Sequence, residues 1–449
     1  MSGELTGYRG EALEVLKRAG AKIGDIVKVV KDSETYEGTL IPRAEYGDDK
    51  HILIKLNTGY NIGLRVSPAI NVTVVGHGAK PSFIRPPPPE QKEGVPKVSI
   101  ISTGGTIASK VDYRTGAVEP ALTAEDLYSI IPELSEIARI DAHVLFSEFS
   151  ENLTPKHWKE TAITVANHIK SGAEGVVVCH GTDTMGYTAA ALSFALQELP
   201  VPVVLVGSQR SSDRPSSDAA TNLMGATTTA AKAPFAEVVL AMHEKSSDDF
   251  MVIHRGTKVR KCHTSRRDTF KSINSLPLAR FNFMTQRFEI LVEDYSKRKA
   301  GDGPLVRPDF EEKVGLIKFH PGMNPEIIDW FNEKKYLGLI LEGSGLGHVS
   351  RYCYEAIRRA IKNGIVIGMT SQCLWGRVDM AVYYTGRDLL SIGVIPLEDM
   401  LPETALIKMM WGFGQTKDPS EVKKIMVKNI AYEVSLRRFE EGKYAEQGK

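Results

Sequence analysis

The stretch VVVCHGTDTMGY, residues 176–187, decides the fold class of this chain. It opens with a short apolar run without charge, which is typical of a strand buried on both faces of a parallel sheet. The run ends in a polar cluster that contains Thr182 and Asp183. Open α/β sheets bind ligands at the carboxyl ends of their strands, and both side chains fall at such an end. The stretch therefore predicts a parallel α/β sheet with a functional site at its edge.

A second apolar run ends in the same manner. Residues 100–109 read IISTGGTIAS, in which Thr103, Gly105 and Thr106 follow the apolar part. The glycines allow a sharp turn and a close approach of a ligand to the backbone. Neither the dinucleotide pattern GxGxxG nor the phosphate-loop pattern GxxxxGK followed by Ser or Thr is present. One such cluster is more often ordinary turn chemistry, but two strand ends of this kind in one sheet favour a site.

The sequence around these runs alternates between strand and helix patterns, which is typical of a sheet covered on both faces. From residue 96 to 295 the apolar runs KVSIIST, GVVVCHG, PVVLVGS and AEVVLAM are separated by helical patterns. One helix begins after Thr154, with Pro155 at its first position. A polar segment, residues 296–314, precedes a second alternation with KVGLIKF, YLGLILEG and GIVIGMT. It predicts a smaller α/β domain over residues 315–449.

The N-terminal region has a different pattern of apolar and polar residues. Residues 1–82 open with a short helical stretch, followed by the β-like runs DIVKVV, EGTLIP, HILIKL and YNIGLRV. Short strands with tight turns and no helix between them predict a small all-β barrel domain. Residues 83–95 contain four consecutive prolines, which adopt polyproline II and cannot join a sheet or helix. We expect a stiff linker there.

Composition narrows the classes of function. The 449 residues suggest about three domains at about 150 residues each. The 56 basic and 55 acidic residues give a net charge of +1, which excludes a chain dominated by basic nucleic-acid contacts. The four cysteines form no CxxC pair and the histidines show no metal-ligand spacing, so we expect no metal and reduced thiols. Without a signal peptide or an apolar span, a cytoplasmic protein is expected.

The two polar clusters together resemble the active-site signatures of the L-asparaginase family of threonine amidohydrolases. TGGTIAS, residues 103–109, is similar to the first signature, and HGTDTM, residues 180–185, is similar to the second. The resemblance extends from about residue 96 to 440 and includes LEGSGLGHV and TSQCLWGRV. It implies a larger parallel-sheet domain followed by a smaller α/β domain, of the cytosolic rather than the secreted type.

The resemblance also implies catalytic roles. Thr106 would be the nucleophile that attacks a side-chain amide, and Tyr113 would orient or deprotonate it. Thr182, Asp183 and Lys261 would form a second group, in which the lysine relays a proton or activates water. Taken without the resemblance, Tyr113 is a surface loop residue and Lys261 belongs to a solvated charged run.

Substrate contacts are implied in the same way. The residues concerned are Thr103, Gly105, Ser150, Glu151 and Asp183. Asp183 would hold the α-ammonium of the substrate and Ser150 its α-carboxylate. Glu151 stands where many family members have glutamine. Since Ser150 and Glu151 precede the expected helix start, local helix capping is the alternative reading of both.

The added N-terminal domain resembles the family of D subunits of archaeal glutamyl-tRNA(Gln) amidotransferases. In that family a small barrel precedes an asparaginase-like body that releases ammonia from asparagine or glutamine. The resemblance implies a partner, the E subunit of the amidotransferase, that binds Glu-tRNA(Gln), uses ATP and Mg²⁺ and captures the ammonia. This chain would need no cofactor of its own, and would be a homodimer within a heterotetramer.

Two other functions stay open at this point. A free-standing cytosolic L-asparaginase with an unrelated N-terminal appendage would hydrolyse asparagine at full rate without a partner. A non-catalytic protein that uses the fold to bind an amino acid or RNA would release no ammonia. The presence of every expected catalytic residue argues against the non-catalytic function. These residues are Thr106, Tyr113, Thr182, Asp183 and Lys261.

Overall fold

The computed structural model describes most of the chain. The described residues are 5, 7–32, 34–43, 48–56, 61–77, 94–105, 107, 109–111, 118–120, 123, 127–128, 131–210, 217–301 and 303–435. The proline-rich linker predicted for residues 83–95 lies outside them, apart from its last two positions.

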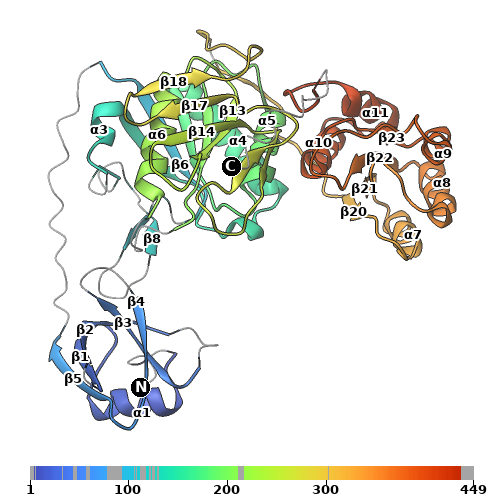
Figure 1. Ribbon diagram of the computed structural model, residues 1–449. Helices are drawn as coiled ribbons and strands as arrows, with labels where there is room; N and C mark the ends of the chain where they lie inside the picture. Colours follow the sequence, from blue (N-terminus) through green and yellow to red (C-terminus); the bar gives the residue numbers. More distant parts are fainter. Residues whose placement is uncertain are drawn as a thin grey trace.

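A small β unit forms the N-terminal part (Figure 1). Its elements are α1 (Gly10–Arg18), β1 (Ile26–Lys31), β2 (Glu34–Leu40), β3 (His51–Leu56), β4 (Asn61–Arg65) and β5 (Asn71–Gly76). The antiparallel sheet has the strand order β4-β3-β2-β1-β5. Val27 and Val29 are fully buried while Lys28 between them is exposed, as the period of two in a half-buried strand requires. Leu16 of α1 is buried in the same core.

The first α/β domain is built on an eight-stranded sheet with the order β18-β17-β14-β13-β12-β10-β6-β9. Its strands are β6 (Lys97–Ser102), β9 (Arg139–Val144), β10 (Gly175–Cys179), β12 (Val203–Val206), β13 (Val238–His243), β14 (Phe250–Arg255), β17 (Ala279–Asn282) and β18 (Arg287–Ile290). Five neighbouring strands are parallel, namely β9, β6, β10, β12 and β13. The other three, β14, β17 and β18, are antiparallel to their neighbours.

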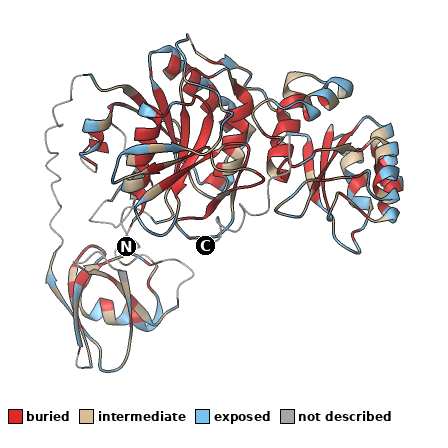
Figure 2. Ribbon diagram, turned by 45° about the horizontal axis from the view of Figure 1, so that its top comes forward, coloured by how far each residue is buried: buried red, intermediate tan, exposed pale blue. Residues whose placement is uncertain are grey.

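Helices cover both faces of this sheet. The helices are α3 (Leu134–Ile137), α4 (Pro155–Lys170), α5 (Met185–Ala195) and α6 (Ala219–Lys232). Helices α3 and α6 pack together over one face, and α4 and α5 pack together over the other. The central strands are therefore buried from end to end, as Figure 2 shows in red. This arrangement explains the uncharged runs of the sequence.

Helix α4 begins where the sequence predicts. Thr154 is its N-cap and Pro155 its first residue, and the Thr154 backbone N–H donates to Nδ1 of His157 at 3.0 Å. Trp158 and Val165 lie on its buried face. The cap bonds come from Thr154 and His157 rather than from the preceding Ser150 and Glu151.

The second α/β domain follows. Its elements are β20 (Val314–Lys318), α7 (Glu326–Glu333), β21 (Gly338–Gly343), α8 (Tyr354–Lys362), β22 (Val366–Ser371), α9 (Tyr384–Ile392), β23 (Ile395–Pro396), α10 (Pro402–Gln415) and α11 (Pro419–Val427). The four strands are parallel in chain order. Helix α10 lies between the two domains in Figure 1, and it packs on α5 as well as on β20 and β21. The two α/β domains thus share one apolar cluster, in which the rings of Phe194 and Trp411 stack at 5.9 Å.

Short elements complete the described chain. They are β7 (Ser109–Val111), β8 (Val118–Pro120), β11 (Leu196–Gln197), β15 (Val259–Lys261), β16 (Phe270–Ser272), β19 (Leu305–Val306) and the 3₁₀ turns η1 (Ser150–Asn152) and η2 (Arg351–Cys353). Strand β19 pairs with β11. The guanidinium of Arg298 donates to the carbonyl oxygens of Glu174, Ala230 and Ala233. The segment 296–314, which the sequence presents as a linker, therefore lies against the first α/β domain.

The described architecture is a small β unit, a larger domain on a mainly parallel sheet and a smaller α/β domain. The predicted fold class is confirmed.

Candidate functional site

The two polar clusters meet at one edge of the large sheet. Strands β6 and β10 are parallel neighbours, with Ser102 opposite Cys179 in register. Beyond them, the backbone N–H and the hydroxyl of Thr103 both donate to the carbonyl of Cys179, at 3.0 and 2.9 Å. The Thr103 side chain is buried and fastens its turn to β10. Its predicted contact with substrate stays a prediction.

The turn after β6 depends on two glycines with positive φ. Gly104 has a φ of 121° and Gly105 a φ of 77°. A Cβ on Gly104 would lie 2.0 Å from the carbonyl oxygen of Glu148, and one on Gly105 would lie 2.9 Å from the backbone nitrogen of Gly181. Both the backbone conformation and the space exclude a side chain. The turns that carry the two signatures are therefore in direct backbone contact.

Lys261 joins the second cluster from the end of β15. Its ammonium donates to Oγ1 of Thr182 at 2.9 Å and to Oδ1 of Asp183 at 2.7 Å. The lysine side chain is 14% exposed, whereas the Asp183 carboxylate is 71% exposed. The hydroxyl, the cation and the carboxylate that the sequence places in one group are thus brought together, with the carboxylate open to solvent.

The buried ring of His180 holds the turn that precedes Thr182 and Asp183 through hydrogen bonds. Its ring is buried, with Nδ1 2.6 Å from the carbonyl of Gly181 and Nε2 2.8 Å from Oγ1 of Thr188. A carbonyl can only accept, so Nδ1 carries the proton and Nε2 accepts from the Thr188 hydroxyl. Burial lowers the pKa of His180 to about 4, which keeps the ring neutral at pH 7. The ring holds the turn before Thr182 and does not face it as a base.

Ser150 and Glu151 lie beside the same turn, on η1. Ser150 is buried, and its carbonyl accepts from the hydroxyl of Thr184 at 2.7 Å. A Cβ on Gly181 would lie 3.0 Å from Oγ of Ser150, so that hydroxyl packs against the turn. Glu151 is exposed. Thr106 and Tyr113, the predicted nucleophile and the predicted loop tyrosine, lie outside the described residues.

The second α/β domain contributes residues that the sequence did not indicate. A cavity of about 140 Å³ beside Asp183 and Lys261 is also lined by Tyr187, Arg260 and Glu403. Glu403 comes from the first turn of α10 and pairs with Arg260 at 3.2 Å. Burial and the nearby Glu403 carboxylate raise the pKa of Tyr187 to about 12. No local pattern around Glu403 marks it, because only the packing of α10 brings it to the site.

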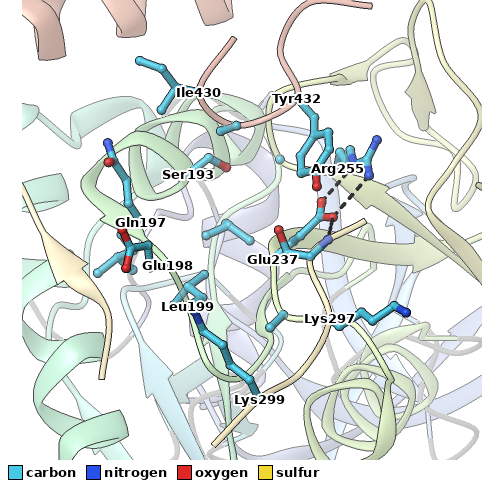
Figure 3. Close-up of a pocket in the computed structure, with 16 residues that line it drawn as sticks. Ser193, Gln197, Glu198, Leu199, Glu237, Arg255, Lys297, Lys299, Ile430 and Tyr432 are labelled. Atoms are coloured by element: carbon cyan, nitrogen blue, oxygen red, sulfur yellow. Dashed lines mark hydrogen bonds and ion pairs between the residues drawn. The ribbon is translucent and has the colours of Figure 1, made fainter. Parts of the chain in front are cut away.

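A larger pocket, of about 480 Å³, lies elsewhere (Figure 3). It is lined by Val238, the first residue of β13, and by Arg255, the last residue of the antiparallel β14. This is the amino edge of the parallel strands, opposite the edge that carries Thr182. In Figure 3 the Arg255 guanidinium lies beside the ring of Tyr432 and is joined by dashed lines to the Glu237 carboxylate. Its Nε is 2.9 Å from Oε2 of Glu237, and its Cζ is 3.9 Å from the centroid of the Tyr432 ring. Although this pocket is larger than the cavity beside Asp183 and Lys261, it lies at the opposite edge of the sheet, and we do not assign the reaction to it.

Two findings concern only the described residues. Within them, no group of three or more His, Cys, Asp or Glu side chains is arranged to hold a metal ion. No helix in that part of the chain has the length and the apolar character needed to cross a membrane.

Three family models match the chain. "Asparaginase, N-terminal" matches residues 97–293, and "Glutaminase/Asparaginase C-terminal domain" matches residues 313–426. "GatD N-terminal domain" matches residues 21–75 of the small β unit.

Similar proteins and structures fall into two groups. The D subunit of the glutamyl-tRNA(Gln) amidotransferase of Metallosphaera sedula is 51% identical over 434 residues, covering 96% of this chain and 97% of that protein. The corresponding D subunit of Pyrococcus furiosus is 50% identical, covering 94% and 97%. The solved L-asparaginase of Thermococcus kodakarensis is 33% identical with a TM-score of 0.67, covering 76% of this chain and 100% of that one. L-asparaginase I of Vibrio cholerae is 30% identical, with the same TM-score and coverage.

The fold and the matching family models define an asparaginase-type amidohydrolase. The solved asparaginases account for 76% of the chain, whereas the D-subunit relatives span almost all of it. The chain belongs to the family of glutamyl-tRNA(Gln) amidotransferase D subunits. The family and the asparaginase-like fold expected from the sequence are confirmed.

Proposed function

We propose that this chain releases ammonia for the tRNA-dependent conversion of Glu-tRNA(Gln) to Gln-tRNA(Gln), by hydrolysing the side-chain amide of asparagine or glutamine. The contact of Lys261 with Thr182 and Asp183, beside the Gly105 turn, is the observation that carries the proposal. It joins a proton-relaying cation, a hydroxyl and an exposed carboxylate at the edge where an α/β sheet binds its ligand.

The proposed reaction has two steps. In the first, Oγ of Thr106 attacks the amide carbon, its proton passes through Tyr113 to the leaving nitrogen, and the carbon–nitrogen bond breaks to release ammonia. In the second, water attacks the resulting ester, and Thr182 with the uncharged amine form of Lys261 relays the proton that the water loses to Oγ1 of Thr106. The ester bond breaks, and aspartate or glutamate leaves with Thr106 restored.

The proposed substrate contacts use the exposed side of the site. The Asp183 carboxylate is 71% exposed and so is available to the α-ammonium of an amino acid. Ser150 and Glu151 lie next to the same turn, where the α-carboxylate and the rest of the polar head would be held. Thr103 and Gly105 would line the substrate-binding site on the side of the turn after β6.

The names of the relatives imply a complex with other amidotransferase subunits, and we propose that the partner is the E subunit. An amidotransferase E subunit would bind Glu-tRNA(Gln) and use ATP and Mg²⁺ to activate the glutamyl carboxyl, so that this chain needs no cofactor. The net charge of +1 is consistent with a partner that makes most tRNA contacts. We further propose a cytoplasmic homodimer within a heterotetramer, and units divided at residues 82, 95, 295 and 314.

The test is ammonia release from asparagine and from glutamine by the purified chain, first alone and then with the E subunit and Glu-tRNA(Gln). Strong stimulation by the partner and the tRNA is expected. Full asparagine hydrolysis by the chain alone, unchanged on addition, would instead identify a free L-asparaginase.

A variant tests the nucleophile. Thr106→Ala should abolish amide-dependent formation of Gln-tRNA(Gln), while formation from added ammonium salt continues. Continued amide-dependent formation would show that another residue attacks the amide.

A further inference from the structure

Lys261 is carried by a very short ribbon. Strands β15 and β16 pair over three residues each, with Lys261 opposite Phe270 at the end nearest Thr182. A two-stranded ribbon of this length is not stable by itself. The position of the Lys261 ammonium therefore depends on the contacts that hold the ribbon, which are the Arg260–Glu403 pair beside Lys261 and those at the other end.

Lys258 stands at that other end, immediately before β15. Its carbonyl accepts from the backbone N–H of Ile273 at 2.7 Å, which closes the base of the ribbon. Its side chain is 2% exposed and its ammonium donates to Oδ2 of Asp399 at 2.8 Å. Asp399 belongs to the second α/β domain, in the loop between β23 and α10. A residue of that domain therefore grips the first strand of the ribbon.

Asp399 has three further partners, one of which is the guanidinium of Arg377, 3.8 Å from Oδ1. Its Oδ1 accepts from the backbone N–H of Ser435 at 2.9 Å, and its carbonyl accepts from the amide of Asn274 at 3.1 Å. Asn274 follows the second strand of the ribbon and also exchanges two hydrogen bonds with the backbone of Gly376. The hydroxyl of Ser435 donates to the carbonyl of Asn274 at 3.1 Å. Both strands of the ribbon are thus held at the base by groups that converge on Asp399.

We propose that Asp399 is a positioning residue for amide hydrolysis. By holding Lys258 and Asn274, it keeps the Lys261 ammonium within hydrogen-bond distance of Thr182 and Asp183. The inference rests on the proposed function of Lys261. It also gives the second α/β domain a role in the chemistry of the first, since the grip on the ribbon depends on how the two domains are packed.

Stability of the fold does not by itself require a buried ion pair such as Lys258–Asp399. An apolar pair of similar volume usually stabilises a fold as well or better, whereas hydrogen-bonded charges fix a direction. The Asp399 carboxylate joins the cation of Lys258 to the backbone of Ser435, which a pair of apolar side chains cannot do.

The test combines Asp399→Asn with Lys261→Met in the full chain. Asp399→Asn should lower kcat for ammonia release about 10- to 100-fold, as expected for a misplaced catalytic group, with KM nearly unchanged. In the Lys261→Met background, Asp399→Asn should have no further effect on the residual rate, because the group that it positions is already missing.

A matched control is Glu237→Gln. Glu237 is an equally buried carboxylate, in an ion pair with Arg255 at the opposite edge of the sheet. Glu237→Gln should leave kcat and KM unchanged at temperatures where the protein is folded. If Asp399→Asn does not fold, the double variant Lys258→Met/Asp399→Leu takes its place with the same expected results, since it removes both charges of the pair and leaves Arg377 paired with Glu398.

Each other result has one meaning. A wild-type rate for the Asp399 variant overturns the inference, and so does a loss of kcat that is equal with and without Lys261. A wild-type rate for Lys261→Met overturns the proposed function of Lys261 itself.

Discussion

At the scale of single residues, the contact between Lys261 and the Thr182–Asp183 pair is the feature that activity should depend on. Lys261→Met should lower kcat for ammonia release about 10²- to 10⁴-fold, the range for loss of a proton-transferring group. The melting temperature should change little, because the ion pair joins Lys261 to a carboxylate that is 71% exposed and such pairs contribute about 1 kcal/mol or less. Lys271→Met is the control, since Lys271 lies on the same ribbon but pairs with Asp268. An equal loss of kcat in both variants would contradict the assignment.

A second residue, His180, should make stability depend on pH. Its pKa is about 4 in the folded protein, because of burial, against an ordinary value near 6.5. Between these values the unfolded chain binds a proton that the folded chain does not, so stability is lost as the pH falls from 6.5 to 4. His180→Asn should reduce the slope of unfolding free energy against pH in this window by about 1.4 kcal/mol per pH unit. Denaturant unfolding at several pH values measures it, and parallel curves for both proteins would show that His180 is not the group responsible.

The structure brings sequence-predicted residues together where a side chain follows a recognisable strand end. Thr182 and Asp183 follow within four residues of the end of β10 at Cys179, and the family resemblance grouped them with Lys261. Glu403 was missed because its helix, α10, reaches the site only through packing on α5. Thr103 lies where the sequence put it, but its hydroxyl is engaged by the Cys179 carbonyl, which no strand pattern reveals.

At the scale of elements, the turn after β6 should tolerate no side chain. Gly105→Ala adds a Cβ about 2.9 Å from the Gly181 nitrogen at a φ of 77°, so the turn must move away from the Thr182 turn. Ammonia release should fall at least about 100-fold, as for a catalytic group misplaced by about 1 Å. Gly172→Ala is the control, because Gly172 also has a positive φ, 87°, but open space around it. It should cost about 1 to 2 kcal/mol in stability and leave the rate unchanged, and similar rates in the two variants would refute the argument.

Helices and strands could be predicted from the sequence where their hydrophobic pattern is compatible with only one kind of element. The uncharged runs became the central parallel strands, and Thr154 with Pro155 marked the start of α4. The segment 296–314 reads as a linker because it is polar and contains glycine, yet Arg298 ties it to three carbonyls at helix and loop ends. Side chain-to-backbone anchors of this kind leave no periodic trace in a sequence.

At the scale of the whole molecule, the two α/β domains share a core and the small β unit has its own. Phe194 is fully buried against Trp411 of the second domain, whereas Leu16 is buried in the core of the β unit. Phe194→Ala should therefore destabilise both α/β domains together, by about 3 to 5 kcal/mol, in one calorimetric transition. Leu16→Ala should lower only the transition of the β unit, by about 2 to 5 kcal/mol, and leave amide hydrolysis by the chain unchanged. Scanning calorimetry with the ammonia assay separates these outcomes. Two transitions for the α/β domains in Phe194→Ala would mean that α10 does not couple them, and loss of ammonia release in Leu16→Ala would mean that the β unit acts on the site.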